Sequence, residues 1–360
     1  MKILFVWTGV TSYMADCWRA LQQRPGVELK IIVEQVASGS DFNAAQVLHD
    51  LDYILVKPQT SSNLKPRASS LVVVDSGSGT ADRAPLYHYH SPLPLSHSSS
   101  TFNPDIIFAV GWHSKVVRAI VGNPALRDVP KVCCFDLPWR WKFRCLAARF
   151  VLGRFLRQYT AAYVPGKACE HYAKWLGFRT IYRGLFSIGM DRFRSSGAEA
   201  RKGFLYVGRF SPEKRIDLLM KAYARYRELG GTWSFDLYGS GTLPNLQTSN
   251  PPNFHSFVQP DELPRIYHDH ACLLLASEFD PWPLVALEAR TSGCEVIQSD
   301  RCGNRLELDT HVVKYGDVEM MAEKMLDVEH GAKAGGSVNL NEWDCTAWCE
   351  RVLKICKEIV

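Results

Sequence analysis

Two successive series of buried-strand and helix patterns constrain the fold of this chain more than any other feature. Each series alternates short, continuous apolar runs with longer segments whose apolar residues recur every three or four positions. Continuous apolar runs are typical of parallel strands buried on both faces, and the longer segments are typical of amphipathic helices. The sequence therefore predicts α/β units in which helices cover parallel sheets.

The first series covers the N-terminal half. It predicts strands at 3–6, 29–33, 53–56, 71–74, 106–110, 131–134 and 161–164, and helices at 14–22, 114–121 and 168–176. Residues 61–100 are rich in Ser and Pro, so we expect loops around one strand there. The second series predicts strands at 204–207, 235–238, 272–276 and 295–298, a helix following the first of them and a helix at 284–292.

The stretch 195–199 has the composition of a linker between the two series, and 360 residues are many for one domain. We expect an N-terminal Rossmann-like domain at 1–186, a linker at 187–202, a C-terminal Rossmann-like domain at 203–341 and a helix with one buried face at 342–360. Two such domains enclose a cleft, which is the usual place for a ligand.

The composition indicates a globular protein, with 46% hydrophobic and 22% charged residues. A net charge of +5 is too mild to indicate nucleic acid binding. The 11 cysteines form no regular pattern, and Cys345 and Cys349 lack a second ligand pair, so we expect reduced, buried thiols in a cytoplasmic protein. The sequence shows neither a signal peptide nor a run of roughly 18 apolar residues, which a membrane-spanning helix needs.

The segment 280–288 combines a loop with the start of a predicted helix. Pro283 stands where a first helical residue would, and the free amides of Leu284 and Val285 form an anion site together with the helix dipole. Glu288, one turn further, can accept two ribose hydroxyls, and Asp280 can reach a sugar beyond the phosphates. On spacing alone, an ordinary amphipathic helix with a surface glutamate is the simpler interpretation.

A second candidate segment follows the strand at 204–207. The strand ends at Gly208, and Arg209 stands at its carboxyl end, where ligands of α/β sheets bind. Lys214 lies near a helix start, where the helix dipole disfavours a cation. A diphosphate bound by both Arg209 and Lys214 would explain why a lysine stands at this position. A solvated basic turn is an equal alternative for this segment taken by itself.

Together, these segments resemble family 4 of the glycosyltransferases, which have the GT-B fold. The matching motifs are residues 207–214 (VGRFSPEK), 238–241 (YGSG), 258–263 (VQPDEL), 277–289 (SEFDPWPLVALEA), 296 and 303–307. The resemblance covers most of 204–320 and extends loosely over 1–186. It implies a final helix that crosses back to the N-terminal domain.

The resemblance implies a retaining glycosyltransferase whose donor is a nucleoside-diphosphate sugar with a uridine or guanosine base, and which needs no metal and no other cofactor. Arg209 and Lys214 match the diphosphate-binding pair of the family, and Glu288 matches the ribose-binding glutamate. The family motif has two glutamates separated by seven residues, and Glu288 matches the second of them. Asp280 stands at the position of the first, with Glu278 nearby out of register. Finally, the region of Val258 and Gln259 matches the part of the backbone that meets the base.

The N-terminal domain is expected to bind the acceptor, a glycan or a lipid-linked molecule. Gly9 lies in the first strand–helix turn and allows close backbone approach. Where many family members have a histidine after a central strand, this chain has Phe135, with Asp136 beside it. His113, at another strand end, is a replacement candidate, although a helix-start residue without chemistry is the simpler interpretation.

Residues 139–157 interleave aromatic and basic side chains. They are typical of a helix that contacts a membrane surface, and equally of a domain-packing helix with a basic outer face. A platform for single-stranded nucleic acid would need a matching fold, which the sequence does not predict.

Two rival functions stay open. An NAD-dependent oxidoreductase would use the turn with Gly77 and Gly79, but Asp82 replaces the third glycine and Pro85 interrupts the following helix. A non-catalytic relative that binds sugar nucleotides or glycans is compatible with Asp280 and Phe135.

Overall fold

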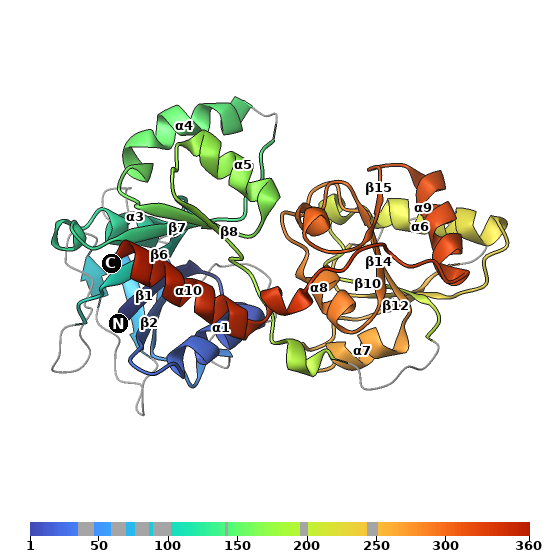
Figure 1. The fold of residues 1–360 in the computed structure, drawn as a ribbon, viewed down its shortest axis with the longest axis horizontal. Helices are drawn as coiled ribbons and strands as arrows, with labels where there is room; N and C mark the ends of the chain where they lie inside the picture. The colour runs from blue at the N-terminus through green and yellow to red at the C-terminus, as the bar shows by residue number, and fades with distance from the viewer. Residues whose placement is uncertain are drawn as a thin grey trace.

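Two α/β units lie side by side in the computed structural model, each with a sheet between layers of helices (Figure 1). The structure describes residues 1–34, 47–58, 70–75, 86–88, 102–140, 143–194, 201–242 and 251–360. The α/β class that the alternating patterns predict is confirmed.

The N-terminal unit is built on a sheet with the order β5-β4-β3-β2-β1-β6-β7-β8-β9. Its strands are β1 (Lys2–Thr8), β2 (Glu28–Glu34), β3 (Tyr53–Pro58), β4 (Ser70–Asp75), β5 (Leu86–His88), β6 (Ile106–Val110), β7 (Lys131–Cys134), β8 (Ala161–Val164) and β9 (Ile181–Arg183). From β3 to β9 the pairs are parallel, which brings the carboxyl ends of the central strands to one edge. Its helices are α1 (Ser12–Gln22), α3 (Lys115–Val121), α4 (Phe143–Leu156) and α5 (Lys167–Leu176).

The edge of this sheet differs from the expectation for residues 61–100. Instead of one strand, the described part of that segment holds β4 and β5, and both pair antiparallel, β4 with β3 and β5 with β4. The Gly77 and Gly79 turn lies outside the described residues. The strand before it is β4, and an antiparallel strand does not provide the parallel β–α–β unit that a dinucleotide fold requires.

The C-terminal unit has an all-parallel sheet with the order β12-β11-β10-β13-β14-β15. The strands are β10 (Phe204–Val207), β11 (Phe235–Tyr238), β12 (Asn253–His255), β13 (Cys272–Leu275), β14 (Glu295–Ser299) and β15 (His311–Val313). The helices are α6 (Ile216–Glu228), α7 (Leu263–Asp269), α8 (Leu284–Thr291) and α9 (Val318–Glu329), with short 3-10 turns η3 (Pro212–Lys214) and η4 (Gly303–Leu306). The strand order reverses direction between β10 and β13, and ligands of such sheets bind at that point.

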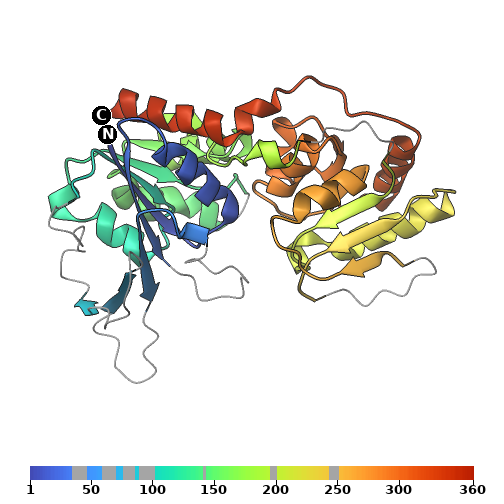
Figure 2. The same ribbon diagram turned by 90° about the horizontal axis from the view of Figure 1, so that it is seen from below.

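Two chain segments connect the units and run side by side. The amide of Ile188 donates to the carbonyl of Trp343 at 3.1 Å, and the amide of Cys345 donates to the carbonyl of Ile188 at 3.1 Å. From there α10 (Cys345–Ile359) lies along α1 of the N-terminal unit (Figure 2). The indole of Trp348 is fully buried between them and donates to the carbonyl of Leu185 at 2.8 Å.

The cysteines are free thiols, and ten of the 11 are buried. In the parts of the chain that the structure describes, no group of three or more His, Cys, Asp or Glu side chains is arranged to hold a metal ion. Among the helices described, none combines the length and apolarity that crossing a membrane requires.

Candidate active site

The loops that follow β10 and β11 contact each other backbone to backbone. Gly208 follows β10 with φ +149° and donates its amide to the carbonyl of Tyr238 at 3.0 Å. A Cβ at Gly239 would overlap the carbonyl oxygen of Gly208, so only glycine allows this approach. This close contact fixes the backbone position of the next residue, Arg209, at the carboxyl edge of the sheet.

The loop between β13 and α8 is held by the loop after β14. The amide of Gly303 donates to the carbonyl of Asp280 at 2.8 Å, and the buried Asn304 donates from Nδ2 to the carbonyl of Pro283 at 2.9 Å. A Cβ at Gly303 would overlap the carbonyl oxygen of Pro281. The protein itself therefore defines the path of the loop that contains Asp280.

Gly303→Ala is expected to displace this loop, because the added methyl group has no space beside the Pro281 carbonyl. The overlap with backbone should cost about 1 to 3 kcal/mol of the free energy of unfolding, as overpacking does. Gly335→Ala is the matched control, since a Cβ there meets nothing within 4 Å. Urea unfolding measures both variants, and equal stability of the two would contradict this account of the loop.

The start of α8 differs from the expectation in one position. Pro283 is the residue before the helix, with φ −66° and ψ 99°, rather than its first helical residue. Its carbonyl accepts from Asn304, and the strand-like ψ keeps the proline outside the helix. The amides of Leu284 and Val285 begin the helix and find no hydrogen-bond partner among the described residues. Both are therefore available to an anion.

Lys214 and Asp280 are brought together by the fold. Lys214 ends η3, and its Nζ lies 2.5 Å from Oδ2 of the buried Asp280. Arg209 is different, since its side chain is 77% exposed and its Nη2 lies 4.0 Å from Oε1 of Glu213. One cation of the predicted pair is thus fixed by a carboxylate, and the other is free to move toward a ligand.

Glu288 is buried, with 9% of its surface exposed, so the surface-glutamate alternative is wrong. Its Oε2 accepts from the hydroxyl of Tyr267 at 2.8 Å. Burial raises the pKa of the Glu288 carboxyl, although the Tyr267 hydroxyl and the charge of Arg192 act against this shift. Tyr267 therefore holds one oxygen of the Glu288 carboxyl, and burial disfavours ionisation of this carboxyl.

Val258 and Gln259 lie in the loop between β12 and α7. Val258 is half-buried and packs against the core, whereas Gln259 is exposed and its amide donates to Oε2 of Glu262 at 3.1 Å. This segment is at the same carboxyl edge of the sheet as Gly208.

In the N-terminal unit, Asp136 follows β7. Burial raises the pKa of its carboxyl, and the charge of Asp280 in the C-terminal unit raises this pKa further. The charge of Asp136 also helps to raise the pKa of the half-buried Tyr13 to about 12, after the larger effect of burial. Gly9 takes the left-handed conformation with φ +72° in the turn before α1.

The two other residues considered on this side lie differently. Phe135 is buried in the N-terminal core, with its ring 5.4 Å from that of Trp112, so it does not replace a cleft histidine. His113 is exposed beside Trp112 and precedes Ser114, which caps α3 by accepting from the amide of Val117 at 3.0 Å. The described contacts do not join His113 to Asp136 or Asp280.

Several contacts between the domains were not predicted. The amide of Lys167, at the start of α5, donates to Oε1 of Glu307 at 2.6 Å. A Cβ at Gly166 would overlap Trp282 and Glu307. The guanidinium of Arg140 lies 4.0 Å from the ring centre of Phe279. The only sequence signal for these contacts was that Phe279, Trp282 and Glu307 fall within matched motifs.

Comparison with known proteins agrees with this arrangement. Residues 201–330 match the family described as glycosyl transferases group 1. An uncharacterized glycosyltransferase of Methanocaldococcus jannaschii is 28% identical over 153 residues, which cover 38% of this chain and 39% of that relative. The match thus spans about two fifths of the relative's length.

Solved structures resemble the whole chain. The lipopolysaccharide outer core galactosyltransferase WaaB has a TM-score of 0.64 at 13% identity, over 100% of both chains. Sucrose-phosphate synthase from Thermosynechococcus elongatus has a TM-score of 0.67 at 13% identity, over 99% of this chain and 98% of that chain. HepE from Anabaena, solved with UDP and glucose, has a TM-score of 0.63 at 15% identity, over 100% of this chain and 98% of that chain.

The fold of the chain is therefore that of the GT-B glycosyltransferases. The resemblance and the fold class predicted from the motifs are confirmed. Residues 201–330, the part that contains Arg209, Lys214 and Glu288, form a domain of the glycosyl transferases group 1 type.

Proposed function

We propose that the protein transfers a sugar from a UDP- or GDP-sugar to a glycan or a lipid-linked acceptor, with retention at the anomeric carbon. The observation that carries the proposal is the start of α8. There, two unpartnered amides lie in the same sheet-edge site as Lys214 and Arg209, one helical turn before a buried carboxyl. HepE, which shares the fold, was solved with UDP and glucose, and that supports a donor of the same class here.

Negative charge builds on the leaving diphosphate as the bond to the sugar breaks. Arg209 provides a planar fork for phosphate oxygens, and the amides of Leu284 and Val285 provide fixed donors. Lys214 has three donor hydrogens, so it can keep its contact with Asp280 while it binds a phosphate oxygen. In this proposal these groups take the place of a metal ion, and the chain needs no cofactor besides the donor substrate.

The nucleoside end of the donor is assigned to the other side of α8. The Glu288 oxygen that Tyr267 does not occupy accepts ribose hydroxyls, and the backbone at Val258 and Gln259 meets the base. Asp280 contacts the donor sugar and is held for that role by Lys214. The side chain of Glu278, two residues earlier, is exposed, and the backbone amide of this residue donates to the carbonyl of Glu213 at 2.8 Å.

The acceptor is assigned to the N-terminal side of the cleft. The raised pKa of Asp136 favours a carboxyl that can exchange a proton with an acceptor hydroxyl. Gly9 leaves open space beside the turn before α1, because a Cβ there would meet nothing within 4 Å. His113 is proposed as an additional acceptor contact.

The proposed location is the cytoplasmic side of a membrane, with peripheral contact through 139–157 and no binding of nucleic acid. The support is α4, whose exposed side chains include both aromatic and basic residues. A lipid-linked acceptor is consistent with such a contact.

Thermal unfolding with UDP, GDP and NAD, followed by donor hydrolysis without acceptor, tests the proposal. We expect UDP or GDP at 100 times its Kd to stabilise the fold by about 2.7 kcal/mol, and NAD to have no effect. Stabilisation by NAD alone would favour the oxidoreductase. Stabilisation by UDP or GDP without sugar transfer or hydrolysis from any nucleotide sugar would favour the non-catalytic relative.

A further inference from the structure

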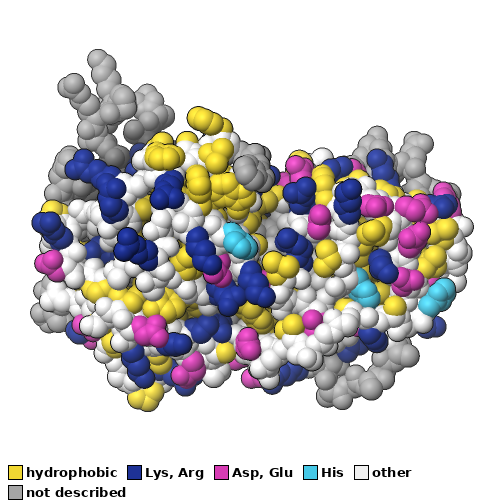
Figure 3. All heavy atoms as spheres, turned by 45° about the horizontal axis from the view of Figure 1, so that its top comes forward, with side chains coloured by type: hydrophobic (Ala, Val, Ile, Leu, Met, Phe, Trp, Pro, Cys, Tyr) yellow, Lys and Arg dark blue, Asp and Glu magenta, His cyan; other side chains and the backbone are white. Residues whose placement is uncertain are grey.

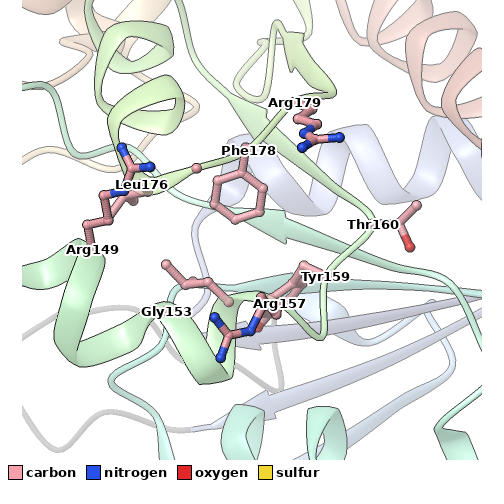
Figure 4. Close-up of a pocket in the computed structure, with 10 residues that line it drawn as sticks. Arg149, Gly153, Arg157, Tyr159, Thr160, Leu176, Phe178 and Arg179 are labelled. Atoms are coloured by element: carbon pink, nitrogen blue, oxygen red, sulfur yellow. The ribbon is translucent and has the colours of Figure 1, made fainter.

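A cavity of about 390 Å³ lies beside α4 in the N-terminal domain (Figure 4). Its walls come from α4, from the turn that follows it and from the loop between α5 and β9. The lining residues are Arg149, Gly153, Leu156, Arg157, Tyr159, Thr160, Leu176, Gly177, Phe178 and Arg179. Nothing in the donor site or the acceptor site uses this cavity.

The cavity is strongly basic. Arg149, Arg157 and Arg179 border it around the ring of Phe178 (Figure 4). The described contacts pair none of the three with a carboxylate, and Arg149 instead lies 5.6 Å from the ring centre of Trp175. The sequence has no Asp or Glu from 137 to 169. Three unpaired guanidinium groups therefore face a space large enough for a phosphate group with its substituents.

The outer face of α4 next to the cavity is apolar and basic. Phe143, Phe150 and Val151 are 83%, 79% and 77% exposed. Phe143 and Phe150 are seven residues apart, and Arg154 continues the same face at helical spacing. Figure 3 shows hydrophobic and basic side chains together on the upper surface of the N-terminal domain, where acidic side chains are few.

We propose that this cavity binds the phosphate of an anionic lipid headgroup while Phe143 and Phe150 enter the membrane interface. The proposal deepens the peripheral contact given under the proposed function and rests on it. Charge complementarity selects the occupant, because guanidinium groups bind phosphate oxygens in pairs and exposed aromatic rings favour the interface. The active-site cleft would then be held beside the surface that carries a lipid-linked acceptor.

The test compares two variants with equal loss of charge. Arg157→Gln with Arg179→Gln removes cavity groups, and Arg144→Gln with Arg154→Gln removes exposed charges of α4 outside the cavity. Binding of the full chain to vesicles of phosphatidylcholine with phosphatidylglycerol is measured by co-sedimentation. General electrostatics predicts about fivefold weaker binding for each lost cation in either variant. We expect the cavity variant to lose at least tenfold more affinity than the control variant.

Equal losses in the two variants would overturn the headgroup site and leave the membrane contact intact. If the wild-type chain does not bind these vesicles but binds soluble glycerol phosphate through Arg157 and Arg179, the ligand of the cavity is a soluble phosphate and the lipid proposal is wrong. Donor hydrolysis without vesicles is measured in parallel and should not change in either variant. If the wild type shows no donor hydrolysis, this result contradicts the proposed transferase function but not the proposed headgroup site.

Discussion

Lys214→Ala is expected to lower kcat for sugar transfer by about 100- to 1,000-fold. Removal of one preformed group that stabilises charge in a transition state typically has an effect of this size. Lys214 is fixed by Asp280 before any ligand binds, so no reorganisation is required when charge develops on the leaving diphosphate. Arg209→Ala should also depress turnover more than donor binding, and steady-state kinetics with the true donor measures both parameters.

The Lys214 variant needs a control for folding, because it leaves the buried carboxyl of Asp280 without its partner. Breaking a buried ion pair can cost about 3 to 5 kcal/mol of stability. The double variant Lys214→Met with Asp280→Asn removes both charges and should recover most of this stability without recovering turnover. Lys221→Ala, an exposed change on α6, should have no effect. Full activity of both Lys214→Ala and Arg209→Ala would refute the diphosphate assignment.

Glu288→Ala is expected to weaken binding of the nucleoside diphosphate by about 10- to 100-fold, since hydrogen bonds to a charged group contribute roughly 1.5 to 3 kcal/mol. Isothermal titration with UDP and GDP measures the change. Glu288→Gln keeps the shape and one acceptor oxygen, so its loss should be smaller. Tyr267 keeps a partner in that variant, which separates the ribose contact from support of the core.

The same residue predicts a pH dependence. Burial raises the pKa of Glu288, so the folded protein binds its proton at a higher pH than an unfolded chain does. Lowering the pH through this raised pKa stabilises the fold and removes an anionic acceptor from the ribose site. As the pH is lowered, wild-type affinity for the nucleotide should therefore begin to decrease at a pH above the ordinary pKa range of a glutamate. Glu288→Gln should abolish this pH dependence. An identical pH profile in both proteins would exclude a ribose contact by the carboxylate.

The parts of the site that lie within one strand–loop–helix unit could be predicted from the sequence. Arg209 follows a buried strand directly, and Glu288 lies on the helix whose start is marked by Pro283. The one-residue error at Pro283 arose because a proline fits φ both in the first turn of a helix and just before it. The conformation was decided by ψ and by Asn304, which lies 21 positions away.

Contacts between distant residues could not be predicted. Lys214 and Asp280 are 66 positions apart, and each was assigned a separate ligand group because local sequence does not show that they pair. Burial of Glu288 depends on Tyr267 of another helix. Phe135 stood at a motif position, but its aromatic neighbours in the N-terminal core determine where its ring lies.

The contact between Glu307 and Lys167 gives α5 a cap that belongs to another domain. Among the described residues of its own unit, no side chain accepts from the first turn of α5, whose preceding residue is Gly166. If the domains separate, the helix loses about 1 kcal/mol of capping, and the half-buried carboxyl of Glu307 loses its backbone donor. Fraying of the first turn of α5 is therefore thermodynamically linked to interdomain rotation, and amide hydrogen exchange at Lys167 would report how often the two halves part.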